Sequence, residues 1–333
     1  MHRRQLFSFG CRIRFKNQNI PLIINRKPDT RGIHMKQVEV LRYDAFSKAA
    51  DKGNPAGIVL EGSHLTDEEM QKIAEKAGYN ETSFLLSSQS ADIRIRYFTP
   101  GHEMNLCGHA TVASLYALYE KGEVGAGEEL KIETKAGNLT VKTDYSEEEQ
   151  RFFMTLEQAP PEFRPFTGDR AKLAGALGIT EADFHDALPP VYGSTGIWTL
   201  LVPVQSLDAC RKMEPDNSEF PAILTDIPSA SVHPFSLETI HQDSHLHGRH
   251  FSSPYSGTIE DPVTGTASGV MGAYMKIYGQ PFCEADQKEF LIEQGQEIGK
   301  DGRVKIGVLE ENGRMKVLMT GTAVFAEKRV IDI

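Results

Sequence analysis

Hydrophobic positions recur along most of this chain with the short period of β-strands. From Met35 onward, alternating or continuous apolar stretches predict strands, and only a few segments carry apolar residues at helical spacing. The strands predicted in the first half cover residues 37–43, 82–86, 93–98, 129–134 and 139–143. The last two flank Ala136-Gly137-Asn138, which predicts a hairpin turn. Many strands with few helices predict an α+β fold rather than an open parallel sheet.

Two predicted helices can be recognised from their ends and their composition. Residues 65–78 combine an apolar stripe with Thr66 as N-cap, Glu69 at the third helical position for a capping box, and Gly78 as the stop. A glycine opens the second predicted helix, over 108–118, and small residues occur on every side of it. Such a helix is expected to be enclosed by other elements.

The second half of the chain echoes the first at a separation of about 140 to 157 residues. A glycine-rich stretch occurs in both halves, as Gly53-Asn54-Pro55-Ala56-Gly57-Ile58 and Gly193-Ser194-Thr195-Gly196-Ile197. A strand followed by a glycine-opened helix also occurs twice, with Arg96-Tyr97-Phe98 before Cys107-Gly108-His109 and Arg249-His250-Phe251 before Thr264-Gly265-Thr266. This spacing is too long for a solenoid, so it predicts two similar domains.

Each echo ends at the amino terminus of a helix, where backbone N–H groups lack partners and the helix dipole is positive. If the two domains face each other across a cleft, the amides near Gly108 and Gly265 could hold a substrate carboxylate. The alternative is that both glycines only permit close packing. Asp261, shortly before the second helix, favours the functional interpretation because a carboxylate there can bind a substrate donor.

Composition argues against a nucleic-acid-binding protein and against a membrane-spanning helix. The 333 residues carry 36 Lys+Arg against 46 Asp+Glu, and the net charge of -10 argues against a nucleic-acid partner. The longest apolar run, residues 197–204, is far shorter than the roughly 18 residues of a membrane span. Four cysteines without a CxxC pair favour a reducing, cytoplasmic setting.

Residues 1–34 differ from the rest of the chain, because they hold eight basic residues and one acidic residue. An Arg-rich, acid-poor start is compatible with a transit peptide, and Arg3-Arg4 with a twin-arginine signal. Arg12, Arg14 and Lys16 interrupt the place where an apolar signal core would lie. We therefore expect an extension outside the fold, which begins near Met35.

Seven motifs in order resemble the phenazine biosynthesis PhzF-like isomerase family, whose relatives include diaminopimelate epimerase and proline racemase. They are Asp44-Ala45-Phe46, Gly53-Asn54-Pro55-Ala56-Gly57, Asn80-Glu81-Thr82-Ser83-Phe84, Phe98-Thr99-Pro100, Leu106-Cys107-Gly108-His109-Ala110-Thr111, Glu260-Asp261-Pro262-Val263-Thr264-Gly265-Thr266-Ala267 and Glu293-Gln294-Gly295. The resemblance implies two pseudo-symmetric domains, each a mixed sheet rolled around a central helix, and a homodimer. The domains would cover 35–157, completed by about 316–333, and 158–315.

The resemblance also implies roles for particular residues. Glu81 matches the family's acid-base glutamate, and His109 and Asp261 match residues that support substrate binding and the proton path. Thr266 stands where many members have serine, so the hydroxyl is kept. The substrate-binding residues expected from these motifs are Asn54, Cys107, Gly108, Gly265 and Thr266.

One departure separates this chain from the two-cysteine racemases and epimerases related to the family. Cys107 precedes the first helix glycine, but Thr264 precedes the second. Because threonine cannot replace a thiol base, a symmetrical two-thiol mechanism is disfavoured. We expect an isomerase that moves a proton on a small carboxylate substrate. An asymmetric amino-acid epimerase using Glu81 with Cys107, or a ligand-binding protein without catalysis, stays open.

No cofactor is implied. Zinc ligand types occur at His241, His245, His247 and His250. The residues between them read as loop, His250 belongs to the predicted strand that echoes Tyr97, and no cysteine or second cluster is nearby, so a metal site is not expected. Neither a Walker motif nor a dinucleotide fingerprint is present in the sequence.

The charge contrast at Met35 gives a test of the extension. A protein beginning at Met35 should melt within about 2 °C of the full chain, because removing unpacked residues loses no buried surface. Differential scanning calorimetry of both proteins measures this, and a loss of several degrees would show that residues 1–34 belong to the fold.

Overall fold

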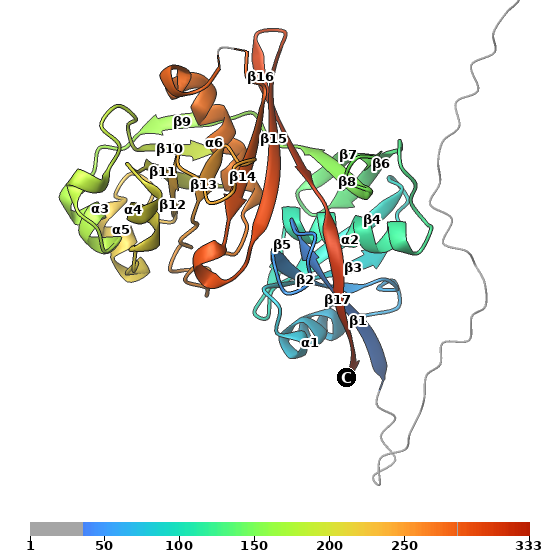
Figure 1. Ribbon diagram of the computed structural model, residues 1–333. Helices are drawn as coiled ribbons and strands as arrows, with labels where there is room; N and C mark the ends of the chain where they lie inside the picture. Colours follow the sequence, from blue (N-terminus) through green and yellow to red (C-terminus); the bar gives the residue numbers. More distant parts are fainter. Residues whose placement is uncertain (1–35, 285) are drawn as a thin grey trace, which may run out of the picture.

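The structure is a computed structural model that describes residues 36–284 and 286–333. The predicted extension over residues 1–34 lies outside the described residues. Strands contain more of the described residues than helices do, and they gather in two bodies that long strands connect (Figure 1).

The elements fall into two series along the chain. The first is β1 (Gln37–Ala45), β2 (Asn54–Val59), α1 (Asp67–Ala77), β3 (Glu81–Leu86), β4 (Ile93–Phe98), β5 (Glu103–Met104), α2 (Gly108–Glu120), β6 (Glu129–Thr134), β7 (Gly137–Ser146) and β8 (Arg151–Glu157). The second is β9 (Glu162–Pro165), α3 (Arg170–Ala176), η1 (Glu181–Asp183), β10 (Val191–Ser194), β11 (Trp198–Pro203), α4 (Leu207–Arg211), η2 (Asn217–Glu219), α5 (Phe220–Ile223), β12 (Ser231–Ser236), β13 (Leu246–Gly248), α6 (Gly265–Tyr278), η3 (Gln280–Phe282), β14 (Glu289–Gln294), η4 (Gln296–Ile298), β15 (Gly302–Glu311), β16 (Arg314–Gly321) and β17 (Ala323–Asp332).

The same order of strand pairings occurs in both series. From β1 to β4 the pairings are antiparallel, parallel and antiparallel; β4 then pairs parallel with β6, and β6, β7 and β8 pair antiparallel. Strands β10 to β16 repeat this order step by step. Helices α2 and α6 enter at the same place in each series. The predicted α+β fold of two pseudo-symmetric units is confirmed.

The chain crosses between the two halves twice. After β8, strand β9 pairs with β10 in the second half, and after β16, strand β17 returns to pair with β1. Strands β8 and β16 also pair directly, so the seventeen strands form one continuous hydrogen-bonded network. Only β17, from Ala323 onward, returns to β1, because β16 (Arg314–Gly321) still pairs with β15. The matching use of β9 was not predicted. We call β1–β8 with β17 the first half and β9–β16 the second half.

Each half packs around one central helix. Helix α2 contacts β1, β2, β3, β8 and β17, and helix α6 contacts β10, β14, β15 and β16. Both helices are buried over their first ten residues or nearly so, which agrees with the small-residue pattern. Burial on all sides explains why neither helix needs a polar face.

The end signals of α1 are confirmed. The Thr66 hydroxyl accepts from the backbone N–H of Glu69 at 3.2 Å, the Glu69 carboxylate accepts from the N–H of Thr66 at 2.9 Å, and Gly78 ends the helix with φ of 70°. The predicted hairpin forms, but its turn is Lys135-Ala136 and not Ala136-Gly137-Asn138, because Thr134 pairs with Gly137.

One sequence echo is out of register. Ala56 pairs with the first residue of β3, and its equivalent Thr199 pairs with the first residue of β12. Gly53 therefore corresponds to Gly196 and not to Gly193. Both have positive φ, 66° and 132°, which Cβ-bearing residues rarely adopt. What repeats is therefore a glycine with positive φ just before the second strand of each half, β2 or β11.

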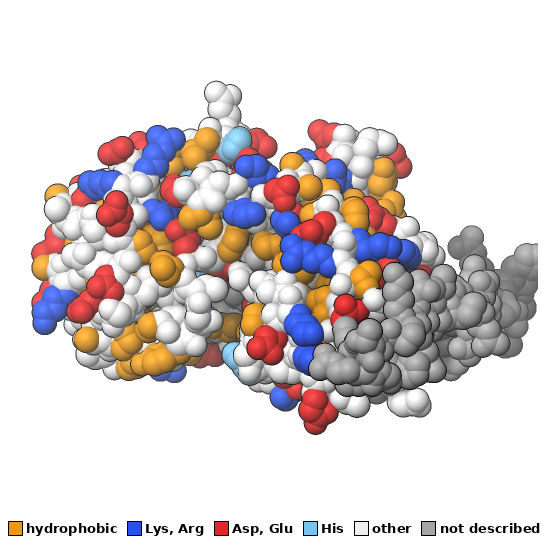
Figure 2. All heavy atoms as spheres, turned by 90° about the horizontal axis from the view of Figure 1, so that it is seen from below, with side chains coloured by type: hydrophobic (Ala, Val, Ile, Leu, Met, Phe, Trp, Pro, Cys, Tyr) orange, Lys and Arg blue, Asp and Glu red, His pale blue; other side chains and the backbone are white. Residues whose placement is uncertain are grey.

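Charge is distributed over the surface without a single basic region in the view of Figure 2, where acidic and basic side chains lie interspersed on both halves. In residues 36–284 and 286–333, none of the helices is both long and apolar enough to cross a membrane.

The turn at Gly53 gives a stability test. A Cβ added there would lie 2.2 Å from the carbonyl oxygen of Ala45, whereas one at Gly122, with φ of 71°, would meet nothing within 4 Å. Gly122→Ala should therefore cost only the left-handed penalty of about 1–2 kcal/mol. Gly53→Ala should cost about 1–3 kcal/mol more, because the backbone must also move. Urea unfolding of the two variants compares these costs, and equal losses would contradict the close approach.

Candidate active site

The site residues predicted from the sequence lie at or just before the first residues of two strands and two helices. Asn54 begins β2 and Glu81 begins the neighbouring parallel strand β3, where Glu81 pairs with Ala56. Cys107 is the N-cap of α2 and His109 lies in its first turn. Asp261 stands in the loop before α6, in the second half of the molecule. The fold brings these five side chains together at the junction of the halves.

The side-chain amide of Asn54 connects the two halves. Its Nδ2 donates to Asp261 Oδ1 and to the carbonyl oxygen of Val263, both at 2.9 Å, and lies 3.4 Å from His109 Nδ1. The residue is 0% exposed, and its Oδ1 has no hydrogen-bond donor among the described residues. Asn54 therefore fixes the Asp261 loop against helix α2.

His109 lies between a carboxylate and a thiol. Its Nε2 is 3.1 Å from Glu81 Oε2, and its Nδ1 is 3.4 Å from Cys107 Sγ. The Glu81 contact is an ion pair without good hydrogen-bond geometry, so Oε2 is buried without a well-directed donor in the part of the chain described. An acceptor of this kind is available to a substrate proton.

Electrostatics at this contact favour a charged imidazole and a neutral thiol. Burial lowers the pKa of His109, but a negative charge on Cys107 or Glu81 and the hydrogen bonds to both raise it above its usual value. With the thiol neutral, the charge of Glu81 is the one that favours the charged imidazole. Burial raises the pKa of the Cys107 thiol, which His109 offsets only in part. Cys107 is consequently a protonated thiol at neutral pH.

Asp261 has an unusual carboxyl group. Burial raises its pKa to about 6, against the opposing effects of His109 and of a short hydrogen bond from the Thr264 hydroxyl. Thr264 is the N-cap of α6, the position that Cys107 occupies at α2. Its hydroxyl is occupied in orienting Asp261, so it does not act as a base.

The two central helices begin close to one another. The side chains of their N-caps, Cys107 and Thr264, accept no hydrogen bond from the first-turn N–H groups, and neither first turn carries an acidic residue. The side chain of Met319 lies against both starts, because a Cβ on Gly108 would be 3.5 Å from its Cε and one on Gly265 would be 2.1 Å from its Sδ. Close packing on Met319 therefore requires a glycine at 265 but not at 108, whatever the backbone N–H groups of the two helix starts bind.

Thr266 follows in the first turn of α6, and its carbonyl oxygen accepts from the Thr195 hydroxyl at 3.0 Å. Sequence reasoning missed the contribution of Gln294, whose side chain binds the Asp261–Thr264 turn. Its presence in the motif Glu293-Gln294-Gly295 was the available signal, but nothing in the sequence showed which turn it would contact.

Glu81, Cys107 and His109 are also the group among the described residues that could hold a metal ion, with ligand atoms within 4.8 Å of one another. A zinc-binding histidine usually donates its second ring N–H to an acceptor. Here the other nitrogen of His109 faces the amide nitrogen of Asn54, which is itself a donor. The arrangement fits proton transfer better than metal coordination.

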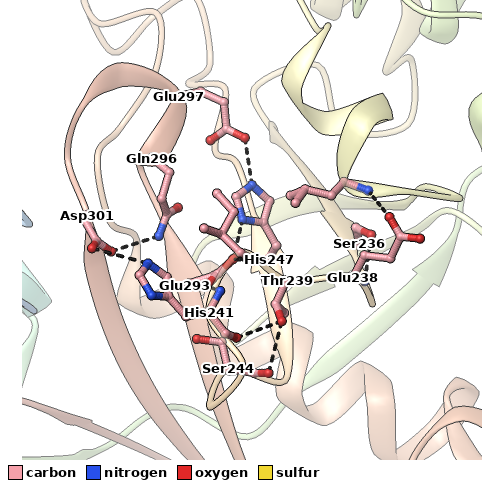
Figure 3. A network of polar contacts seen from close by, with 12 residues as sticks. Ser236, Glu238, Thr239, His241, Ser244, His247, Glu293, Gln296, Glu297 and Asp301 are labelled. Atoms are coloured by element: carbon pink, nitrogen blue, oxygen red, sulfur yellow. Dashed lines mark hydrogen bonds and ion pairs between the residues drawn. The ribbon is translucent and has the colours of Figure 1, made fainter.

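The four histidines of the run beginning at His241 do not converge. His247 is bound between Glu293 and Glu297, at 2.8 Å from each, and His241 lies 3.5 Å from Asp301 (Figure 3). His245 accepts from the backbone N–H of Leu291, and His250 contacts His233. His241 and His247 belong to one network through Glu293, but their ring nitrogens face different carboxylates, and His245 and His250 make contacts of their own.

Comparison with known proteins gives the class. A family model described as "Phenazine biosynthesis-like protein" matches residues 43–329. "Uncharacterized isomerase YfhB" of Bacillus subtilis is 65% identical over 299 residues, covering 90% of this chain and 100% of that protein. A crystal structure of a Bacillus anthracis phenazine biosynthesis protein of the PhzF family is 50% identical with a TM-score of 0.86, covering 90% and 100% of the two chains.

A hydroxyproline epimerase from Agrobacterium vitis shares the fold, with 13% identity and a TM-score of 0.57 over 89% of this chain and 93% of that one. Relatives named isomerase therefore match most of this chain, and the likeness to the epimerase shows a shared fold. The chain belongs to the phenazine biosynthesis-like protein family.

The Glu81–His109 contact predicts a measurable coupling. Glu81→Gln removes the negative charge 3.1 Å from the ring, so the charged imidazole loses stabilisation and the pKa of His109 should fall. Titration of His109 by NMR measures this. Glu103→Gln is the matched control, since Glu103 binds Arg96 elsewhere on the surface and should leave His109 unchanged. An unaltered His109 pKa in Glu81→Gln would show that the two groups are not coupled.

Proposed function

We propose that this protein is a cofactor-independent isomerase that transfers a proton on a small carboxylate-bearing metabolite, by epimerisation or by a double-bond shift. The observation that supports this most is the buried Oε2 of Glu81, which has no well-directed donor and lies beside His109. Glu81 would accept the proton from a carbon atom and return it. Cys107, Gly108, Gly265 and Thr266 would surround the substrate, which a homodimer would bind at two sites.

The two helix starts would make the substrate carbon next to the carboxylate acidic enough to lose its proton to Glu81. A substrate carboxylate at the first-turn amides of α2 and α6 would meet two positive dipole ends. Removal of a proton from the adjacent carbon places further negative charge on the carboxylate oxygens. Donors fixed beforehand around these atoms stabilise that charge without reorganisation. The positive charge of the His109 ring, which lies beside Glu81, would also stabilise this negative charge on the carboxylate.

Asn54 and Asp261 supply the substrate's polar recognition in this proposal. The Asn54 Oδ1 is a buried acceptor without a donor in the described chain, so an amino or hydroxyl group on the substrate would satisfy it. Asp261, with a pKa of about 6, can exchange a proton near neutral pH. An amino acid or hydroxy acid thus fits the available acceptors.

An asymmetric epimerase that uses Cys107 as the second base is the alternative. The 3.4 Å separation between Cys107 Sγ and His109 Nδ1 favours it, since the imidazole could accept the thiol proton. The raised pKa of the Cys107 thiol argues against it. A cysteine that stays protonated can pack against the substrate without taking part in proton transfer.

Substitution separates the two mechanisms. Glu81→Gln keeps the shape but cannot accept a proton, so exchange of substrate hydrogen with solvent deuterium should fall by at least about 10²–10⁴-fold. Cys107→Ser should cost less than about tenfold. NMR of the substrate in D₂O measures both rates.

Both variants must first melt like the parent and retain thermal protection by ligand, which excludes a folding defect. The opposite ranking, with Glu81→Gln active and Cys107→Ser inactive, would replace the single-acid mechanism by a cysteine-dependent one.

Carboxylate binding has its own test. Titration of the ¹⁵N-labelled protein with a small dicarboxylate should shift the amide signals of Gly108, His109, Gly265 and Thr266 together, because the anion contacts both helix starts. Glycerol at the same concentration is the uncharged control. Shifts confined to one helix, or equal shifts with glycerol, would rule out a shared anion site.

A further inference from the structure

The triplet Glu293-Gln294-Gly295 closes strand β14 and has no part in the mechanism so far. Consecutive side chains on a strand point to opposite faces, so Glu293 and Gln294 face different surroundings. Glu293 contacts His247 and the backbone N–H groups of Ile240 and His241. Gln294 faces the junction of the halves.

Gln294 binds both ends of the turn that carries Asp261. The side chain is 1% exposed. Its Oε1 accepts from the backbone N–H of Thr264 at 3.1 Å, and its Nε2 donates to the carbonyl oxygen of Asp261 at 2.8 Å. The same Nε2 lies 3.2 Å from the Thr264 hydroxyl. One amide therefore fixes the separation between Asp261 and the start of α6.

These contacts determine the direction of the next hydrogen bond. An amide nitrogen can only donate, so the Thr264 hydroxyl accepts from Gln294 and gives its own hydrogen to Asp261 Oδ2. Asp261 Oδ1 is left to accept from Asn54. Both carboxylate oxygens then have assigned donors, and the carboxylate plane is set.

We propose that Gln294 is a positioning residue for the isomerase reaction, which holds Asp261 through Thr264 in the orientation that faces His109 and the substrate. This inference rests on the proposed function for the role of Asp261. Gln294 does not contact the substrate in this proposal. It acts by donating to the Thr264 hydroxyl, which then donates to Asp261.

The neighbours of Gln294 keep it in place. Figure 3 shows His247 held between Glu293 and Glu297, and His247 and Glu293 are each 0% exposed. Gly295 has φ of 95°, and a Cβ there would lie 2.5 Å from the carbonyl oxygen of Pro262 and 2.0 Å from that of Lys300. The end of β14 thus packs directly on the Asp261-Pro262 segment, which leaves Gln294 little freedom to move.

The test compares two glutamines. Gln294→Met removes all three contacts with little change in volume, and it should lower the rate of solvent deuterium exchange by about tenfold to a hundredfold, as expected for a misplaced reacting group. Gln71→Met is the matched control, because Gln71 also donates to a backbone carbonyl, that of Thr99 at 2.9 Å. It should leave exchange within about twofold of the parent.

A second readout does not depend on catalysis. The charged groups that face Asp261 are His109 and Glu81, and neither is altered in these variants. The Thr264 hydroxyl lowers the pKa of Asp261, so Thr264→Val should raise it above about 6, and Gln294→Met should raise it in the same direction. Thr264→Ser keeps the hydroxyl and should restore the parent value. Carbon-13 NMR of the Asp261 carboxyl measures all three.

An unchanged Asp261 pKa in Gln294→Met would overturn the proposal, whether or not exchange falls, because the loss would then come from a general structural effect. Exchange within twofold of the parent in Gln294→Met would also overturn it. If Glu81→Gln proves fully active, the proposed function fails, and the Asp261 titration still decides the role of Gln294.

Discussion

The hydrogen bonds of the Asn54 side-chain amide to Asp261 and Val263 are the constraint on which the site depends. Asn54 belongs to the first half, and its acceptors belong to the second. Because the amide is fully buried, breaking these bonds would leave polar groups without partners, at a cost of about 1–3 kcal/mol each. This cost holds the two helix starts close together, with Glu81 and His109 on one side and Asp261 on the other.

The two halves share one backbone arrangement, but equivalent positions carry different side chains. Several site residues have an equivalent of a different type in the other half. The pairs are Glu81 and Ser231, Cys107 and Thr264, His109 and Thr266, and Gln294 and Thr134. Strand pairing uses backbone groups and tolerates this divergence. In the proposed mechanism, the first half supplies the proton-transfer group, and the second supplies a carboxylate whose orientation is fixed by Thr264 and Asn54. A single-acid mechanism is consistent with that division.

Short sequence motifs predicted several elements of the fold and several residues of the candidate site. The capping box of α1, the enclosed helix at Gly108 and the motifs around Glu81 and Asp261 depend on residues close in sequence, so they could be recognised. The contact of Gln294 with Thr264 spans 30 residues and depends on strand register, which the pattern does not specify. Register also accounts for the misplaced echo at Gly193. The packing of Gly265 on Met319 joins segments 54 residues apart, and only the folded chain reveals it.

The central claim is that the junction of the two halves moves a proton on a carboxylate without a metal or cofactor. The most direct measurement is NMR of amino, hydroxy and cyclic carboxylic acids incubated in D₂O with the parent protein after treatment with a chelator. The account predicts that an acid which protects the protein against heat also gains deuterium at the carbon next to its carboxylate, with inversion or a shifted double bond. Acids that bind and protect the protein but never gain deuterium would contradict it.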